Sequence, residues 1–370
     1  MKKIIIALFV FLALVQAAAA VEPVYLFLEK DGSPGKIHGL SKEDMRLHPL
    51  QNFWYTESYF FIAYLESGEI AYLNLLVSNM GLQKNTPALT LTVITPDRKR
   101  LTAEGDFAPS DLKAAADKFS LSIGPNTLAG DDKNLTLNVH QGDLGLELSF
   151  NSSAPGFKLG DGLVYFGDKK EIFYAINYPA PRARISGQII YQGKKVPAKG
   201  WGYVDHCWYN ANTTDFEQVW HNIKFFSPAH TLIVTSFSTP EAYGGKLVGL
   251  AALVNDEKAA YAATDLKVSE FNHEFDQTGG KNYPRRILYE FSGPGFSGKI
   301  DFNSSKITEK MDVLEKLDKG AGNKALKWTI NKFVAKPYYY RSVGPAEMEL
   351  FKPGPGKTSG QASCEVIFVK

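Results

Sequence analysis

A short segment at the middle of the chain carries the side chains best suited to acid–base chemistry. Residues 200–210 read Gly-Trp-Gly-Tyr-Val-Asp-His-Cys-Trp-Tyr-Asn, a composition typical of a β-strand. Because strand side chains alternate between two faces, we expect Asp205 to share its face with Trp201 and Tyr203. A carboxyl group among aromatic rings has a raised pKa, so Asp205 is a candidate proton donor near neutral pH. We therefore predict that Asp205 faces a pocket.

The opposite face of this segment carries His206 and Trp208. We expect these two side chains to brace the strand, with His206 held by hydrogen bonds. A structural role is the alternative for Asp205 as well, because a buried carboxylate in an aromatic strand often only accepts a hydrogen bond from a neighbouring backbone or tryptophan N–H. The residue types alone leave both roles of Asp205 open.

A second aromatic and acidic stretch opens the first strong strand of the chain, which we predict over residues 52–66. Tyr55 and Glu57 share one face of this strand, and Trp54 lies on the other. Glu57 is therefore flanked by rings, and the alternative for it is a solvated or arginine-paired side chain. The predicted ligand-binding residues are Trp54, Tyr55, Glu57, Trp201, Tyr203, Asp205, His206, Trp208 and Trp220.

Motifs for cofactor chemistry are absent from the sequence. It contains no Gly-x-Ser-x-Gly elbow, no phosphate-binding loop, no dinucleotide fingerprint and no Cys-x-x-Cys pair. The seven histidines lack the spacing of a metal-binding motif, although His206 and His221 could meet across strands. We therefore expect no metal and no cofactor. Cys207 and Cys364 form either a disulfide or two buried free thiols, and the sequence does not decide between them.

The segment over residues 1–20 has the pattern of a secretory signal peptide. Lys2 and Lys3 precede an apolar run, and small residues lead up to Ala20. We expect cleavage after Ala20 and an exported protein, either periplasmic or secreted. Without Lys2 and Lys3, 39 basic residues balance 39 acidic ones, and a neutral chain without a Lys/Arg cluster is a poor candidate for binding nucleic acid. No second apolar run of spanning length follows, so we expect no membrane span in the mature chain.

The rest of the chain has the pattern of an all-β protein. Short apolar or alternating runs recur between Gly, Pro, Asn and Asp residues, and long helical periodicity is scarce, as in β-sandwiches and barrels. The length permits two domains, which we place at residues 21–195 and 196–370. We also expect a proline-bearing corner over 177–182, a mobile loop over 316–324 and a strand over 327–334.

The segment that contains Asp205 also resembles the motif of a known superfamily. Residues 202–208, Gly-Tyr-Val-Asp-His-Cys-Trp, are similar to the core motif of the lipocalin-like double-domain superfamily. Its members include AttH-like proteins, carotenoid 1,2-hydratases, fungal survival-factor proteins and Diels–Alderase-type cyclases. Residues 52–57, 339–341 and 360–365 fit the same resemblance, so the matching stretches span most of the chain after residue 20.

This resemblance implies two tandem lipocalin-like antiparallel β-barrels with aromatic-walled cavities. A binding protein of this kind would hold a hydrophobic small molecule, a lipid or isoprenoid, at or between the barrels. An enzyme of the hydratase or cyclase type would instead protonate a polyene with Asp205 and stabilise the cation with aromatic faces. A structural envelope factor is a third reading. Many relatives have other residues at Cys207 and Tyr209, and some have a second His at Val204, which favours binding over chemistry.

Overall fold

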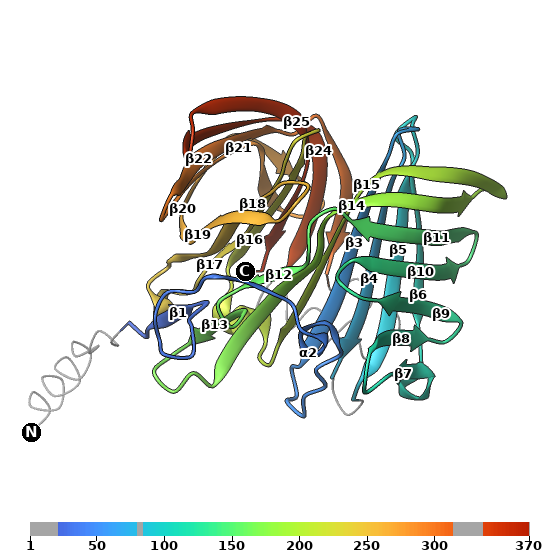
Figure 1. The fold of residues 1–370 in the computed structure, drawn as a ribbon, viewed down its shortest axis with the longest axis horizontal. Coiled ribbons are helices and arrows are strands. Elements are labelled where there is room, and N and C mark those ends of the chain that lie inside the picture. The colour runs from blue at the N-terminus through green and yellow to red at the C-terminus, as the bar shows by residue number, and fades with distance from the viewer. Residues whose placement is uncertain (1–20, 80–83, 314–335, 370) are drawn as a thin grey trace, which may run out of the picture.

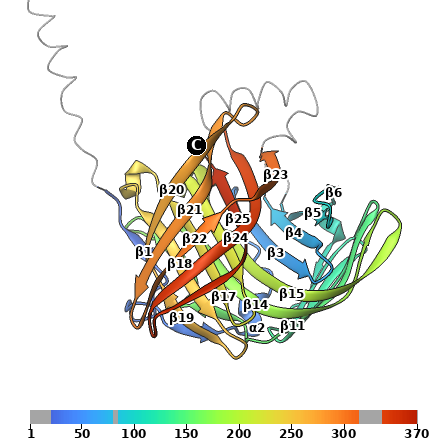
Figure 2. The same cartoon turned by 90° about the horizontal axis from the view of Figure 1, so that it is seen from above.

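The computed structural model describes residues 21–79, 84–313 and 336–369. Strands make up 66% of the structure and helices 4%, which confirms the all-β prediction. The strands form two curled antiparallel sheets that lie side by side (Figure 1 and Figure 2). The expected signal peptide, the loop over 316–324 and the strand over 327–334 lie outside the described residues.

The first sheet places the central segment beside the first strong strand. Across the sheet the order is β6 (Arg100–Asp106), β5 (Thr86–Ile94), β4 (Ile70–Ser78), β3 (Thr56–Leu65), β15 (Lys194–Tyr209), β14 (Ile172–Tyr191), β11 (Leu144–Ser152), β10 (Asn134–Gln141), β9 (Asn126–Gly130), β8 (Phe119–Ile123) and β7 (Leu112–Ala114). Four short strands extend it near β14, namely β1 (Val24–Leu26), β2 (Ile37–Gly39), β12 (Phe157–Leu159) and β13 (Leu163–Phe166).

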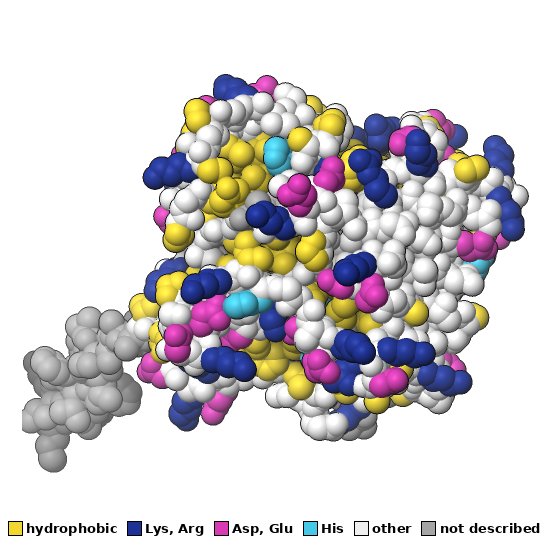
Figure 3. Space-filling view, viewed as in Figure 1, with side chains coloured by type: hydrophobic (Ala, Val, Ile, Leu, Met, Phe, Trp, Pro, Cys, Tyr) yellow, Lys and Arg dark blue, Asp and Glu magenta, His cyan; other side chains and the backbone are white. Residues whose placement is uncertain are grey.

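The second sheet is built from the C-terminal half of the chain. Its order is β19 (Ala259–Ala263), β18 (Leu247–Val254), β17 (Thr231–Ser238), β16 (Val219–Phe226), β25 (Gly356–Phe368), β24 (Tyr338–Lys352), β22 (Phe296–Asn303), β21 (Lys281–Gly293) and β20 (Asp265–Asp276), with β23 (Lys306–Asp312) beside β24. On the face shown in Figure 3, hydrophobic side chains gather over β18 and β19.

Within the described residues, helical structure is limited to short turns between strands. The α-helices there are α2 (Lys42–Met45) and α3 (Thr213–Phe216), and the 3₁₀ turns are η1 (Pro109–Asp111) and η2 (Glu241–Tyr243). Ser41 caps α2 by accepting from the Asp44 backbone N–H while the Asp44 carboxylate accepts from the Ser41 backbone, a capping box that lets so short a helix form. None of the helices within the described ranges has the length and hydrophobicity needed to cross a bilayer.

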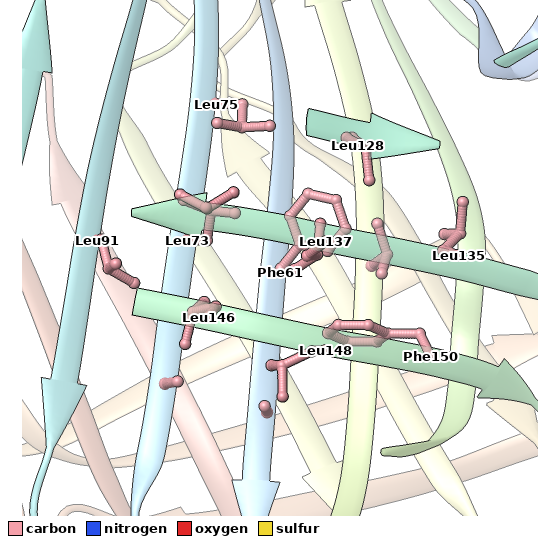
Figure 4. Packing of buried hydrophobic residues seen from close by; sticks show 14 of the residues in the cluster. Phe61, Leu73, Leu75, Leu91, Leu128, Leu135, Leu137, Leu146, Leu148 and Phe150 are labelled. Atoms are coloured by element: carbon pink, nitrogen blue, oxygen red, sulfur yellow. The ribbon is translucent and has the colours of Figure 1, made fainter. Parts of the chain in front are cut away.

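The first sheet curls into what is here called the first barrel, and the second sheet into the second barrel. Alternating burial along the strands builds the core of the first barrel. In β10, Leu135, Leu137 and Val139 point inward while their neighbours point to solvent. The sheet folds over on itself, so that β10 and β11 lie across β3, β4 and β5 and their leucine and phenylalanine side chains interdigitate (Figure 4). Phe61 of β3 meets Phe150 of β11 edge-on, with ring centres 5.6 Å apart. This packing fixes which face of β3 and β15 looks into the first barrel.

β14 continues through the segment for which we expected a proline corner. The strand runs unbroken from Ile172 to Tyr191, and its pairing with β15 shifts register between Asn177 and Ala180 and again between Ala180 and Ala183. Proline has no N–H to donate, but a sheet tolerates it where the ladder is already interrupted by a bulge. The predicted corner was therefore wrong, because the prolines fall at irregular points of one continuous strand.

The two sheets meet along a shared hydrophobic cluster, here called the junction. It combines side chains of β3, β4, β14 and β15 that face away from the first barrel with side chains of β16, β17, β18 and β24. The chain passes from the first sheet to the second between Tyr209, where β15 ends, and Val219, where β16 begins. Residues 195 and 196, between which we expected the boundary, lie in β15, which hydrogen-bonds to β14 and β3 of the first sheet.

Candidate ligand site at the junction of the two sheets

β15 presents two chemically different faces, as its alternation predicted. Asp205 lies opposite Phe60 of β3 and on the side of Tyr203, and both rings belong to the junction cluster. His206 lies opposite Tyr59, whose ring belongs to the core of the first barrel. The structure therefore separates Asp205, which faces the junction, from His206, which faces the first barrel.

Asp205 is buried in the junction with two polar neighbours. Its side chain accepts a 2.8 Å hydrogen bond from the Tyr203 hydroxyl, and the Lys224 ammonium nitrogen lies 3.8 Å from the same carboxylate oxygen. Burial raises the pKa of Asp205 to about 6, while Lys224 and Tyr203 oppose the rise because they stabilise the charged form. Lys224 and Tyr203 therefore partly stabilise the negative charge of Asp205, and Asp205 is not an isolated acid.

The charges around Asp205 extend into the second sheet through hydrogen bonds. Lys224 donates to the side-chain oxygen of Asn222, whose amide donates to Glu365 at 3.2 Å. Arg341 donates to Glu365 from Nε at 3.0 Å and from Nη2 at 2.9 Å, and its guanidinium lies 4.0 Å from the ring centre of Tyr72 in the first sheet. Burial alone would raise the pKa of Glu365, but Arg341 and Lys224 bring it below its usual value. This network links the two sheets by paired charges.

A cluster of aromatic rings lies next to these charges. Trp220 of β16 stacks on Phe237 of β17 with ring centres 5.5 Å apart, and both rings meet Tyr174 of β14 edge-on. Phe216 of α3 packs edge-on against Tyr209 at the end of β15, with centres 5.7 Å apart. The rings come from both sheets and from the connection between them, so they form an aromatic wall that belongs to neither barrel alone.

Polar groups without partners are buried at this aromatic wall. The hydroxyls of Tyr174 and Tyr178 have no hydrogen-bond partner in the described part of the chain, although the Cys207 thiol and the Thr235 hydroxyl lie nearby. The Glu217 carboxyl, near Tyr174, is 4% exposed and forms no side-chain hydrogen bond or ion pair with any described residue. Burial raises the pKa of Glu217 well above its usual value, which favours the neutral carboxyl, a group that can donate a hydrogen bond.

Trp201 is held between two arginine side chains. The guanidinium carbons of Arg182 and Arg184 lie 3.7 and 3.3 Å from its ring centre. Arg182 is fully buried, pairs with Asp256 at 2.6 Å and donates to the Pro228 carbonyl at 2.7 Å. Because both faces of the indole carry a cation, Trp201 is part of a clamp between β14, β15 and two loops of the second sheet.

On the first-barrel side, His206 belongs to a buried group centred on Glu57. His206 Nε2 lies 2.6 Å from Glu57 Oε1, and His206 Nδ1 lies 3.2 Å from the Asp44 carbonyl oxygen. Glu57 Oε2 accepts from the Tyr55 hydroxyl and, at 2.8 Å, from the His48 backbone N–H. Burial opposes ionisation of Glu57, but the bonds with His206 and His48 outweigh it and lower its pKa to about 2.

Trp208 and Trp54 occupy contrasting environments. Trp208 is 9% exposed and stacks on His48 with ring centres 4.0 Å apart and planes 8° apart, in keeping with its expected bracing role. Trp54 lies in the turn before β3 and is 44% exposed. The predicted residues therefore divide into a junction set (Tyr203, Asp205 and Trp220), the clamped Trp201, a first-barrel set (Tyr55, Glu57, His206 and Trp208) and the surface residue Trp54.

Several residues of these groups escaped sequence reasoning. His48, Glu217 and Lys224 belong to no motif in the sequence, and Arg341 lies in the stretch 339–341, which fits the superfamily resemblance but received no role from it. The available signal was Lys224 itself, a lysine next to the apolar residues Ile223, Phe225 and Phe226 of one strand. Such a charge is expected to be paired when buried, but the sequence does not name the partner on another strand.

Two open questions about histidines and cysteines are answered by the geometry. His221 lies 2.6 Å from Glu270 of the second barrel, so it does not meet His206, which points into the first barrel. Cys207 and Cys364 are free thiols, and Cys364 is buried in the core of the second barrel.

A recess of about 680 Å³ opens beside the adjacent strands β16, β25, β24 and β22 of the second sheet. Its lining residues are Phe226, Pro228, Asn303, Pro345, Ala346, Glu347, Ser359, Gly360 and Gln361. Phe226 also belongs to the junction cluster and packs on Tyr64 of β3, with ring centres 4.8 Å apart. The recess therefore reaches the edge of the junction, although it contains none of the residues predicted from the sequence.

Known proteins with curated names match this chain over most of its length. The "Ceramide-binding protein svf1" of Emericella nidulans is 25% identical over 278 residues, 70% of each chain, and the "Ceramide-binding protein SVF1" of Yarrowia lipolytica is 24% identical over 352 residues, 85% of each chain.

Solved structures share the fold. CghA in complex with Sch210972 has a TM-score of 0.64 at 10% identity and covers 95% of this chain and 99% of its own. An AttH-like protein from Nitrosomonas europaea has a TM-score of 0.63 at 13% identity, with 90% and 98% covered. Kievitone hydratase from Nectria haematococca has a TM-score of 0.59 at 13% identity, with 94% and 97% covered. These likenesses confirm the lipocalin-like double-barrel fold, and the match of residues 20–370 to the Svf1 family shows that the chain belongs to that family.

Proposed function

We propose that this protein binds a lipid of the ceramide class, with long hydrocarbon chains and a small polar head, at the junction of its two sheets. The Svf1 family match and the ceramide-binding names of the relatives from E. nidulans and Y. lipolytica support a lipid ligand.

The observation that carries the proposal is the set of unpartnered polar groups at the aromatic wall. The buried Glu217 carboxyl forms no side-chain hydrogen bond or ion pair with a described residue, and the hydroxyls of Tyr174 and Tyr178 make no hydrogen bond of normal geometry there, although the Cys207 thiol and the Thr235 hydroxyl lie nearby. Each unsatisfied group costs roughly 1–3 kcal/mol, and a ligand that supplies the missing hydrogen bonds removes this cost. An amide and hydroxyl head offers both donors and acceptors, which a neutral carboxyl and two phenols complement.

The rest of the junction suits the hydrocarbon part of such a lipid. Its apolar side chains come from both sheets and include Phe60, Ile62, Ile233, Phe237, Val248 and Leu250. Each buried CH₂ contributes about 0.8 kcal/mol, so the chains would supply most of the affinity while the polar groups orient the head. The recess beside Phe226 is the route by which we expect the lipid to enter.

Acid catalysis on a polyene by Asp205 is the alternative function. The raised pKa of Asp205, about 6, favours it. The Lys224 ammonium at 3.8 Å and the Tyr203 hydroxyl at 2.8 Å both stabilise the ionised carboxylate, however, and an ionised group is a poor proton donor. Binding without chemistry therefore accounts for more of the observed contacts.

Native mass spectrometry of protein purified from its own host, followed by lipid extraction, tests the proposal. We expect one long-chain lipid per protein, with an amide or hydroxyl head. An apo protein that leaves added ceramide unbound and transforms an added polyene would instead support the enzymatic alternative and overturn the proposal.

Replacing Glu217 by leucine is expected to change stability and affinity in opposite directions. Removing a buried, unpartnered carboxyl should raise the free energy of unfolding by about 1–2 kcal/mol. The same change removes a hydrogen bond to the lipid head, so ceramide affinity should fall about tenfold, equivalent to about 1.4 kcal/mol. Denaturant unfolding and a fluorescent ceramide titration measure the two effects.

The matched control for this prediction is Glu217→Gln, which keeps a donor and an acceptor in the same place. We expect it to bind ceramide within a few-fold of the wild type. If Glu217→Leu destabilises the protein and leaves ceramide affinity unchanged, Glu217 is a structural residue and the polar head binds elsewhere.

We also propose that the protein is exported after cleavage near Ala20. The basic start, the apolar run and the small residues before Val21 support this assignment. N-terminal sequencing of protein from the periplasmic or secreted fraction should begin close to Val21. Recovery of a chain that still begins at Met1 in the membrane fraction would mean that the segment is an anchor.

A further inference from the structure

Three ligand atoms from separate parts of the chain converge inside the first barrel. They come from His48, Glu57 and His206, one from each side chain, and all lie within 4.8 Å of one another. Glu57 Oε1 is 2.6 Å from His206 Nε2 and 3.2 Å from His48 Nδ1. We propose that these three side chains bind one divalent metal ion, and that their chemistry suits Zn²⁺ best.

The surroundings of His206 call for a cation. Its Nδ1 faces the Asp44 carbonyl oxygen at 3.2 Å, and its Nε2 faces the Glu57 carboxylate at 2.6 Å. Both neighbours are acceptors, whereas a neutral imidazole carries a single N–H. One ring nitrogen must therefore carry an extra proton or bind a cation. A histidine that binds a metal through one nitrogen usually donates its other N–H to a carbonyl or carboxylate, as the Asp44 carbonyl allows here.

Glu57 is arranged as a ligand that uses one oxygen. Its Oε2 is already occupied by the Tyr55 hydroxyl and by the His48 backbone N–H at 2.8 Å. Its Oε1 is the oxygen that faces both imidazoles, and it also lies 3.1 Å from the His48 backbone N–H that Oε2 accepts more closely. A metal bound at Oε1 would therefore leave the bonds at Oε2 intact, and those bonds would hold the carboxylate in place as outer-shell contacts do in known metal sites.

The two rings are held in position by stacking. His206 stacks on Tyr59 with ring centres 4.0 Å apart, and His48 stacks on Trp208 at the same distance. The His48 side chain is 27% exposed while that of Glu57 is fully buried, so an ion has a path from solvent along His48. A site needs such an entry path and fixed ligands before metal arrives.

The identity of the metal follows from the donor set. Two imidazoles and one carboxylate with an open fourth position form the ligand set of many zinc sites, and imidazole is less suited to Mg²⁺ or Ca²⁺. Donor atoms on a tetrahedral zinc ion are roughly 3.3 Å apart. The 3.2 Å contact between Glu57 and His48 already matches this spacing, and the 2.6 Å contact with His206 would have to lengthen.

A second group of the same residue types provides a control within the chain. Glu270 of the second barrel lies between His221, 2.6 Å from Oε1, and His273, 3.1 Å from Oε2. Here the histidines contact different carboxylate oxygens, and among the described residues the convergent ligand atoms belong to His48, Glu57 and His206 and not to this group. We therefore expect metal binding to depend on His48 and not on His273.

The test uses untagged full-length protein that has been stripped with a chelator and dialysed. Calorimetric titration with Zn²⁺ should show one equivalent bound, and titration with Co²⁺ should produce the intense visible absorption of a four-coordinate site. His48→Gln should weaken Zn²⁺ binding by at least about tenfold, since loss even of an outer-shell partner costs 10- to 100-fold. His273→Gln should bind Zn²⁺ as the wild type does.

Two results overturn the proposal. Wild-type protein that takes up no stoichiometric Zn²⁺ and has a featureless Co²⁺ spectrum would mean that His206 carries an extra proton instead. Equal loss of binding in His48→Gln and His273→Gln would place the metal elsewhere. The wild-type Co²⁺ spectrum decides the question even if the His48 variant does not fold.

Discussion

Replacing Arg341 by methionine is expected to lower the free energy of unfolding by about 3–5 kcal/mol. The side chain is 8% exposed and pairs with Glu365 at 2.9 Å and with Glu309 at 2.6 Å. Methionine fills the space of the aliphatic part of the arginine side chain but removes the positive charge beside both buried carboxylates. A buried charge without a partner of opposite sign is costly. Urea unfolding of the variant and the wild type, compared at equal m-values, measures the loss.

The matched control is Arg286→Met. Arg286 also makes two hydrogen bonds to one carboxylate, at 2.9 and 2.6 Å from Asp301, but its side chain is 39% exposed. Solvent screens this pair, so little change in stability is expected. Combining Arg341→Met with Glu365→Met should recover part of the loss because an apolar pair replaces the charges. Equal effects of the two arginine variants would show that buried ion pairs do not hold the junction.

Trp208→Ala is expected to destabilise the protein by about 3–5 kcal/mol, the cost of a large cavity in a packed region. The indole packs with Tyr55, Val77 and Ala175, and it stacks on His48. Its removal therefore frees the segment around His48 from the first barrel as well as leaving a void. Thermal and denaturant unfolding of the variant provide the measurement.

Asp205→Asn is the comparison for this prediction. Asparagine keeps the shape of the side chain and can still accept from the Tyr203 hydroxyl, so we expect stability within about 1 kcal/mol of the wild type. Unfolding caused by Asp205→Asn together with an unaffected Trp208→Ala would mean that the structural and ligand-facing sides of β15 have been exchanged.

The sequence predicted which side chains of β15 lie together because a strand has a period of two. Once Asp205 was placed on one face, Tyr203 had to share that face and His206 had to lie on the other. The same rule placed Tyr55 and Glu57 together on the first strong strand. The all-β class followed equally from local patterns, since short alternating runs with turn residues permit few other folds.

Contacts between distant strands were beyond this reasoning. The pairing of His206 with Glu57 depends on the register between β3 and β15, which no short-range pattern specifies. Glu217 and Lys224 acquire their roles only when the second sheet packs on the first. The prediction of a proline corner in β14 was wrong for a related reason. Pairing with strands on both sides of β14 outweighs the local preference of two prolines for a bend.

Photocrosslinking with a ceramide that carries a diazirine in its acyl chain tests the lipid-binding site most directly. After irradiation of the full-length protein and peptide sequencing, we predict that the label lies on junction residues such as Tyr174, Trp220 and Phe237, and that excess unlabelled ceramide competes it away. Two results would contradict a ceramide site between the two sheets. One is label confined to the interior of one barrel, for example at Ile287 or Phe302, and the other is label that excess ceramide does not displace.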